Sequence, residues 1–252
     1  MAKLAQKVAL ITGGGGGIGR ATALAFAAEG ATVIVCDIAA PAAEAVAAEV
    51  SESGGQAVAI TADVARDDQV RALIAEIVTR FGRLDIAFNN AAIDVEHEPL
   101  ERCSEETFDE LMRVNVKGVW LCMKHEIQQM LAQGSGAIVN TSSIAGLSGA
   151  ARQPVYAATK HAILGLTKSA ALEYGRKGIR VNAVCPGVIR TQMMERALAR
   201  DPRRQVRVER IHPIGRVGEA EEIARAVVFL SSDDAAFVLG HALAVDGGFS
   251  AT

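Results

Sequence analysis

VALITGGGGGIG, residues Val8–Gly19, joins a short apolar run to five consecutive glycines. An apolar run that ends in glycines is typical of a buried strand, and Ile18–Glu29 then has helical spacing. Glycine lets the backbone approach an anion closely, and the free N–H groups at a helix start favour phosphate. The stretch therefore predicts the strand, turn and helix that begin a dinucleotide-binding βαβ unit.

The glycines of this loop fit two phosphate-binding patterns. Gly-x-Gly-x-x-Gly is matched by Gly14, Gly16 and Gly19. Thr-Gly-x-x-x-Gly-x-Gly is matched by Gly13, Gly17 and Gly19. We prefer the second pattern because Thr12 ends the strand and Ile18 begins the helix.

Strand-like and helix-like segments alternate along the whole chain. The strand-like segments are Val8–Thr12, Thr32–Cys36, Ala57–Thr61, Leu84–Phe88, Gly136–Thr141, Ile179–Val184 and Ala242–Val245. The helix-like segments are Ile18–Glu29, Pro41–Ser53, Asp67–Phe81, Ser104–Leu131, Gln153–Tyr174 and Glu219–Leu230. Such alternation predicts an α/β fold, a doubly wound parallel seven-stranded sheet in a single domain over residues 1–252. Residues 191–213 interrupt it, and we interpret them as a helical lid over the substrate site.

Bulk composition narrows the classes of function. Half of the 252 residues are hydrophobic but only 4% are aromatic, as expected of a buried parallel sheet with closely packed helices. A net charge of −3 gives no reason to expect a nucleic-acid partner. No apolar run has the length of a membrane span, and the N-terminal residues lack the apolar core of a signal peptide. The four cysteines lack the spacing of metal ligands, so we expect no metal, free thiols and a cytoplasmic protein.

Asp37 follows the second strand, eighteen positions after Gly19. A carboxylate there accepts hydrogen bonds from the hydroxyls of an adenosine ribose, and it repels a 2′-phosphate. No Lys or Arg at positions 14–16 or 38–40 offsets that repulsion, and Arg20 is the only nearby cation in the sequence. The expected cofactor is therefore NAD rather than NADP.

Tyr156 and Lys160 stand four residues apart within the predicted helix Gln153–Tyr174, so they share one face of it. A neighbouring ammonium group stabilises a phenolate and lowers the pKa of the phenol. The pair is therefore a candidate general acid/base near neutral pH. The same spacing also fits a tyrosine that packs under a lysine stem.

With these motifs in order, the chain resembles the short-chain dehydrogenase/reductase family from Val8 to Gly248. The resemblance is carried by the Thr12–Gly19 loop, Asp63-Val64, Asn89-Asn90-Ala91, Asn115, Ser142-Ser143, Tyr156-x-x-x-Lys160, Pro186-Gly187 with Thr191, and Asp246-Gly247-Gly248. Ala92 departs from the family, which usually has Gly after Asn-Asn-Ala. The family implies a Rossmann fold with strand order 3-2-1-4-5-6-7.

The resemblance also implies residue roles. Tyr156 is the proton-transfer group, and Ser143 holds the substrate oxygen. Lys160 keeps Tyr156 acidic and binds the nicotinamide ribose, and Asn115 holds a water that is linked to this lysine. The implied cofactor-binding residues are Gly13, Gly17, Ile18, Gly19, Asp37, Asp63, Val64, Asn90, Ala91, Tyr156, Lys160, Pro186, Gly187, Ile189 and Thr191.

The substrate pocket is expected to be mostly apolar. By position, its residues are Ile93, Val95, Ala145, Leu147, Gln153, Val188, Met193 and Met194. Such a lining favours a medium-sized ketone or secondary alcohol. Gln153 either orients a polar substrate group or caps its helix, and Glu96 and His97 are interpreted as a solvated loop at the rim.

The expected function is hydride transfer between nicotinamide and a secondary alcohol or ketone. One alternative is a reductase of 3-oxoacyl thioesters carried by acyl-carrier protein or coenzyme A, and another is a sugar dehydrogenase of the glucose type. The thioester alternative would use an arginine-rich segment to bind the anionic carrier. Its arginines are Arg196, Arg200, Arg203, Arg204, Arg207 and Arg210. A non-catalytic NAD-binding regulator is an alternative of a different class.

Small residues mark one face of the predicted Tyr156 helix. They are Ala158, Ala162, Gly165 and Ser169. By resemblance, this face and the long helix from Ser104 form a dimer interface, and the last strand with the Glu219 helix forms another. A homotetramer is therefore expected, with a small-molecule substrate and no membrane partner.

Overall fold

The structure is a computed structural model that describes residues 2–191, Met194 and residues 211–251. Seven parallel strands form one sheet in the order β3-β2-β1-β4-β5-β6-β7. The strands are β1 Val8–Thr12, β2 Thr32–Asp37, β3 Gln56–Thr61, β4 Ile86–Asn89, β5 Gly136–Thr141, β6 Ile179–Pro186 and β7 Ala242–Val245. The predicted fold class and strand order are confirmed.

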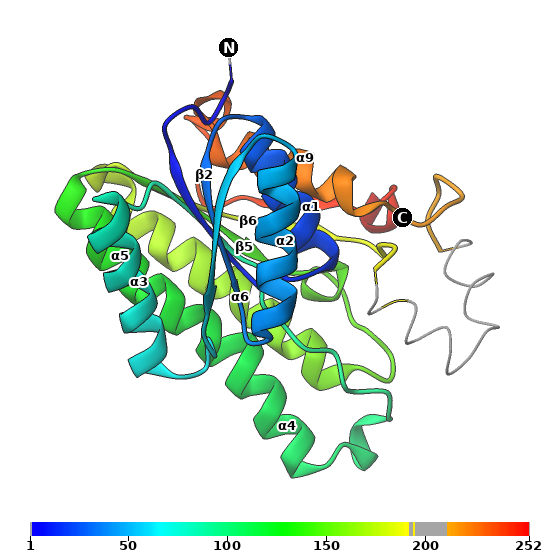
Figure 1. Cartoon of the computed structure of the whole chain (residues 1–252). Coiled ribbons are helices and arrows are strands. Elements are labelled where there is room, and N and C mark those ends of the chain that lie inside the picture. Colours follow the sequence, from blue (N-terminus) through cyan, green and yellow to red (C-terminus); the bar gives the residue numbers. More distant parts are fainter. Residues whose placement is uncertain (1, 192–193, 195–210, 252) are drawn as a thin grey trace.

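Helices cover both faces of the sheet (Figure 1). On one face lie α1 Gly17–Ala28, α2 Ala40–Glu52 and α9 Ala220–Ser231. On the other face lie α3 Asp67–Phe81, α5 Val119–Gln133 and α6 Pro154–Tyr174. Each layer has its own apolar core, with Phe26 and Phe88 in the first and Leu10 and Ile77 in the second. Most other core side chains are Ala, Val, Leu or Ile, which lets the helices lie close to the sheet.

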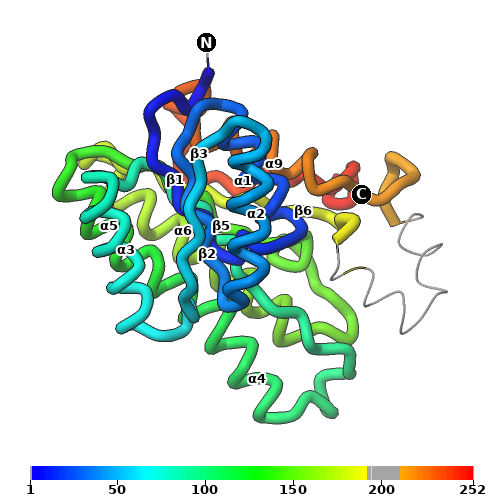
Figure 2. Tube along the Cα trace, in the orientation of Figure 1, coloured from blue at the N-terminus to red at the C-terminus, as the bar shows by residue number. Residues whose placement is uncertain are grey.

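The carboxyl edge of the sheet gathers the segments with functional motifs. In the tube view of Figure 2, β1, β2 and β3 come from the N-terminal part of the chain and lie near one another. Because β1 pairs with β2 on one side and β4 on the other, the direction of chain winding reverses there. Ligands of open α/β sheets bind at such a reversal, beyond the carboxyl ends of the strands.

The predicted helix Ser104–Leu131 consists of three segments. α4 Glu105–Leu111 is followed by a π-helical turn, Met112–Gly118, and then by α5. α4 extends below the rest of the molecule in Figure 1. A π-helical turn adds a residue to the helical repeat, often at functional sites, and hydrophobic spacing alone does not reveal it.

Strand β4 begins two residues later than predicted, at Ile86 instead of Leu84. The backbone of Leu84 is bound by the Gln133 side chain, which accepts from the amide at 3.2 Å and donates to the carbonyl at 2.6 Å. These bonds replace a strand ladder at this position.

Within the described residues, no helix combines the length and apolar character that crossing a membrane requires. Most of the predicted lid at 191–213, including Met193 and the arginines from 196 to 210, lies outside the described residues.

Candidate active site

The loop after β1 is closed against β4 on one side and open on the other. Gly13 and Gly17 have φ values of 61° and 50°, which strain any residue that has a Cβ. A Cβ on Gly13 would lie 2.8 Å from the Cα of Ala91, whereas one on Gly16 would meet no atom within 4 Å. The open side coincides with the N-terminus of α1, so the residues present fit a dinucleotide phosphate group. The positive φ values at Gly13 and Gly17 favour the pattern with a threonine before its first glycine.

Asp37 ends β2 beside this loop. Its Oδ2 accepts from the Gly15 amide and its Oδ1 from the Ala39 amide, both at 3.0 Å. Arg20, on α1, binds Glu49 of α2 through both Nε, at 2.7 Å, and Nη2. The carboxylate therefore faces the phosphate loop, and the nearby cation is already bound to a carboxylate.

Tyr156, Lys160 and Ser143 form one cluster at the ends of β5 and α6. The Nζ of Lys160 lies 5.5 Å from the centroid of the Tyr156 ring and donates to the Thr141 carbonyl at 3.0 Å. The Ser143 side chain lies close enough to Tyr156 to lower the pKa of its phenol, and it accepts from the Ala145 amide at 3.1 Å. Ser142, the rival serine, instead donates to the Lys160 carbonyl at 2.9 Å. Ser143 is thus the serine at the phenol.

Burial dominates the electrostatics of this cluster. It raises the pKa of Tyr156 above its ordinary value, Asp94 raises that pKa further, and Ser143 lowers it. Burial also lowers the pKa of Lys160 to about 8, against the opposing effect of Asp94. The expected lowering of the phenol's pKa is not found here, because desolvation of the phenolate is the largest effect on it and raises it.

Asn115 lies in the π-helical turn and is fully buried. Its Oδ1 accepts from the Ile93 amide at 2.8 Å, and its Nδ2 donates to the Ile93 carbonyl at 2.9 Å. The Nδ2 also lies 3.4 Å from the Thr159 Oγ1, next to Lys160. Asn115 therefore links the loop after β4 to α6, while its water-mediated role towards Lys160 stays a prediction.

Glu96 caps the helix that carries Tyr156. Its carboxylate accepts from the amides of Val155, at 3.2 Å, and Tyr156, at 2.8 Å, and only 2% of Glu96 is exposed. Beside it, Arg152 donates to the His97 carbonyl at 2.9 and 3.2 Å. The interpretation of Glu96 as a solvated rim residue is therefore wrong. A cap supplied from about sixty residues earlier in the chain has no local sequence signal.

Asp94 and Gln153 form a second contact between the same loop and helix. The Nε2 of Gln153 lies 2.8 Å from each carboxylate oxygen of Asp94. Gln153 makes no side-chain cap on α6, so the capping alternative is wrong. Asp94 stands between two predicted pocket residues, and its contact with a residue 59 positions later has no local sequence signal.

One protein-family profile covers nearly the whole chain. The sequence profile described as enoyl-(acyl carrier protein) reductase matches residues 14–250. The chain belongs to the short-chain dehydrogenase/reductase family.

Relatives of this short-chain dehydrogenase/reductase match it from end to end. The 2,5-dichloro-2,5-cyclohexadiene-1,4-diol dehydrogenase of Sphingobium indicum is 48% identical over 252 residues, which is 100% of both chains. The cyclohexanol dehydrogenase of an Acinetobacter species is 45% identical over 98% of this chain and 96% of its own. The chain is accordingly a dehydrogenase/ketoreductase that binds a nicotinamide cofactor.

Solved structures share the fold over nearly the full length. The crystal structure of levodione reductase has a TM-score of 0.95 at 42% identity, over 99% of both chains. That of a putative NAD(P)-dependent gluconate 5-dehydrogenase from Beutenbergia cavernae, with bound NADP at low occupancy, has a TM-score of 0.94 at 36% identity, also over 99% of both chains.

Two further residues that are expected to bind the cofactor, Asp63 and Asn90, have hydrogen-bond partners in the structure. The Oδ2 of Asp63 accepts a hydrogen bond from Arg113 at 3.2 Å, which connects the segment after β3 to the π-helical turn. Asn90 donates to the Gly13 carbonyl at 3.0 Å, and its own amide donates to the Thr12 hydroxyl at 3.1 Å. Asn90 thus joins the ends of β1 and β4.

The segment after β6 is held by the start of α9. Ile189 forms an isolated parallel bridge with Gly218, and the Gly218 amide donates to the Val188 carbonyl at 3.0 Å. The Val188 amide donates to Nε2 of the buried His212 at 3.1 Å. The backbone expected to meet the nicotinamide is therefore fixed on both sides.

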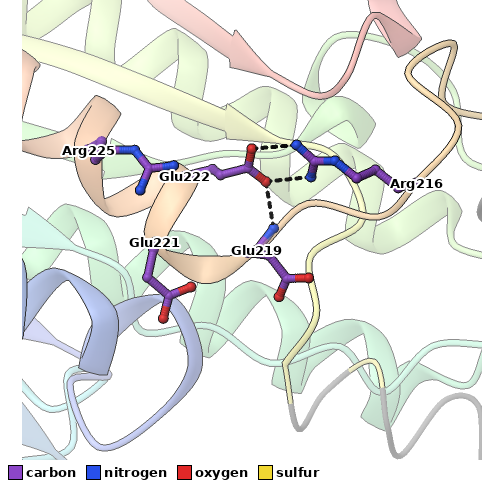
Figure 3. A pocket seen from close by; sticks show the side chains of 5 residues that line it. All are labelled: Arg216, Glu219, Glu221, Glu222 and Arg225. Atoms are coloured by element: carbon purple, nitrogen blue, oxygen red, sulfur yellow. Dashed lines mark hydrogen bonds and ion pairs between the residues drawn. The ribbon is translucent and has the colours of Figure 1, made fainter.

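Figure 3 shows a charged surface pocket at this junction. Arg216 donates to both oxygens of Glu222 at 2.7 Å, and Glu222 accepts from the Glu219 amide at 2.9 Å. Arg190 donates to Glu219 at 3.1 Å. These charged side chains bind one another, and the bond between Arg190 and Glu219 connects the segment after β6 to the start of α9.

The described pocket residues lie on the segments after β4, β5 and β6 and at the start of α6. Val95 and Leu147 leave large apolar surfaces exposed, at 53% and 39%, whereas Ala145 is buried. Met194 donates its amide to the Thr191 hydroxyl at 3.4 Å. Apolar surface is therefore available on the same segments after β4 and β5 that carry Asp94 and Ser143.

Proposed function

We propose that this chain is an NAD-dependent dehydrogenase of secondary alcohols that also reduces the corresponding ketones. The carrying observation is the cluster of Ser143, Tyr156 and Lys160 at the carboxyl edge of the sheet, beside an open glycine loop. Two relatives are named for six-membered cyclic alcohols, and the apolar surfaces of Val95 and Leu147 suit such a ring. A cyclic secondary alcohol is therefore the proposed substrate.

In alcohol oxidation, the phenolate oxygen of Tyr156 takes the proton of the substrate hydroxyl. Ser143 donates a hydrogen bond to the substrate oxygen as it changes between alcohol and ketone. Lys160 binds the cofactor ribose and supplies positive charge near Tyr156, and Asn115 positions the water that carries the proton onward. A bound nicotinamide supplies the acceptor for the hydride of the carbinol carbon.

The raised pKa of Tyr156 has a consequence for direction. The phenol is protonated at neutral pH, which suits a general acid in ketone reduction. Oxidation requires the phenolate, so the rate of alcohol oxidation is expected to rise towards alkaline pH.

The proposed cofactor residues are those of the glycine loop, the ends of β2 and β4, and the segment after β6. NAD is preferred over NADP because Asp37 faces the loop and Arg20 is bound to Glu49. The four free cysteines suit a reducing compartment, so we place the protein in the cytoplasm.

The experiment that tests this function is a substrate panel followed by NADH formation. Cyclohexanol and cyclohexanediols are expected to reduce NAD⁺, and the reverse reaction is expected with cyclohexanone and NADH. Turnover of only 3-hydroxyacyl thioesters or of only glucose-type sugars would select one of the alternatives. Cofactor binding with no turnover of any panel member would select the non-catalytic regulator.

A further inference from the structure

The carboxylate of Asp94 lies at the edge of the catalytic cluster. Gln153, to which it is bonded at 2.8 Å from each oxygen, is three residues before Tyr156 at the start of the same helix. The charge of Asp94 influences both Tyr156 and Lys160. Asp94 therefore lies on a loop that contacts the start of α6, three residues before Tyr156.

The backbone on both sides of Asp94 is fixed. Asn115 exchanges two hydrogen bonds with the preceding Ile93, at 2.8 and 2.9 Å. Glu96, two residues later, is buried and accepts from the Tyr156 amide at 2.8 Å. The Asp94–Gln153 pair is thus preorganised by the residues that position the catalytic helix, which makes a ligand contact there selective.

The pair offers both kinds of hydrogen-bonding group. A carboxylate accepts about four hydrogen bonds through its two oxygens, and the bond from Gln153 alone does not fill the acceptor positions of Asp94. Gln153 has a second N–H and a carbonyl oxygen. A neutral hydroxyl, which donates and accepts at once, matches this pair, whereas a substrate carboxylate would be repelled by Asp94.

We propose that Asp94 and Gln153 bind a second hydroxyl of the substrate, so that the preferred substrates are diols rather than simple alcohols. This inference rests on the proposed function. The second hydroxyl donates to Asp94 and accepts from Gln153 while the reacting hydroxyl is bound by Ser143 and Tyr156. Acidic sugars are disfavoured by the same carboxylate.

The test compares kcat/KM for cyclohexanol with kcat/KM for the cis and trans forms of cyclohexane-1,2-, 1,3- and 1,4-diol, with NAD⁺. Wild-type protein is expected to prefer at least one diol over cyclohexanol by about 10-fold or more. In Asp94→Asn this diol preference is expected to fall about 10- to 100-fold, as for a lost hydrogen bond to a charged group. The ratio of the two substrates cancels any effect of the substitution on Tyr156, because both substrates need that group.

Two further variants keep the test decisive. Asp94→Ala removes the acceptor altogether and is expected to abolish the preference, while Asp109→Asn removes an exposed carboxylate of α4 and is expected to leave it unchanged. An equal fall for diols and cyclohexanol in the Asp94 variants, or no diol preference in the wild type, would overturn the inference and leave the proposed function standing. Failure of the wild type to oxidise every alcohol would overturn both.

Discussion

Asp37 is the residue on which cofactor choice depends most directly. Its carboxylate bonds the Gly15 amide beside the phosphate loop, and a ribose 2′-phosphate there would meet its negative charge. Arg20, the nearby cation, is held by Glu49. The proposed preference for NAD therefore depends on this one carboxylate.

Asp37→Ser tests this single charge. The variant keeps a hydrogen-bonding side chain but loses the repulsion, so the preference for NAD⁺ over NADP⁺ in kcat/KM is expected to fall by at least about 10-fold. Steady-state kinetics with both cofactors measure it, and Asp68→Asn on the exposed start of α3 is the control. A wild type that prefers NADP⁺, or a variant with an unchanged ratio, would contradict the assignment.

At the residue scale, the sequence predicts which side chains lie near one another better than it predicts their pKa values. The four-residue spacing of Tyr156 and Lys160 correctly predicts that the ammonium lies near the ring. It does not predict that burial raises the pKa of the phenol, because desolvation depends on packing by distant segments. Nor does the local sequence predict the contact of Asp94 with Gln153, since the two residues are 59 positions apart.

Helix α6 carries Tyr156, the proposed catalytic phenol, and the start of this helix is held by a buried carboxylate. Glu96 accepts from two amides at the N-terminus of α6, where the helix dipole favours a negative charge. The loop after β4 is in turn held by Asn115 from the π-helical turn. Three segments thus fix one catalytic group.

Glu96→Gln is expected to weaken this element. The amide retains one acceptor but directs an N–H group at a backbone N–H, which should lower the free energy of unfolding by about 1–2 kcal/mol and reduce kcat. Urea unfolding and steady-state kinetics measure the two effects. Glu98→Gln, an exposed neighbour, should change neither. Equal stability of the two variants would show that the Glu96 cap contributes nothing.

At the element scale, the sequence predicts which segments form helices and strands. It does not predict the contacts that connect these elements. The hydrophobic spacing of Ser104–Leu131 predicts a helix but does not reveal the π-helical turn that contains Asn115. The cap at Glu96 and the bridge between Ile189 and Gly218 each connect residues far apart in the sequence. Local propensity carries no information about such contacts.

At the scale of the whole molecule, small and aromatic residues are exposed on the surfaces of α5 and α6. Ala158, Gly165 and Ser169 are exposed on α6, and Trp120 of α5 is 47% exposed. Leu172, further along α6, is 85% exposed. Exposed apolar surface beside small residues suits close helix contact between copies, which agrees with the proposed homotetramer.

Gly165→Arg separates assembly from folding. A Cβ on Gly165 would meet no atom of its own chain within 4 Å, so the isolated fold should tolerate the arginine. Light scattering is expected to give four times the chain mass of 26.4 kDa for the wild type and a smaller mass for the variant, with unchanged circular dichroism. Ser53→Arg, at the exposed end of α2, is the control. A monomeric wild type, or a variant that remains a tetramer, would contradict this interface.

The order of the sheet was expected from the family resemblance, because right-handed crossovers alone are compatible with several strand orders. The structure has that order, with β1 at the reversal where the glycine loop begins. The sequence predicts the lid only as an interruption of the alternating pattern, because residues 195–210 carry no strand pattern. These residues lie outside the described part of the chain.

The central claim is that Tyr156 transfers the proton in secondary-alcohol oxidation, and Tyr156→Phe tests it most directly. The variant keeps the ring packed against Lys160 and removes only the hydroxyl. Cyclohexanol oxidation with NAD⁺ is expected to fall at least about 100-fold in kcat, and the wild-type rise towards alkaline pH should disappear, while NADH binding measured by fluorescence stays nearly unchanged. Near-normal turnover of Tyr156→Phe with intact NADH binding would contradict the account.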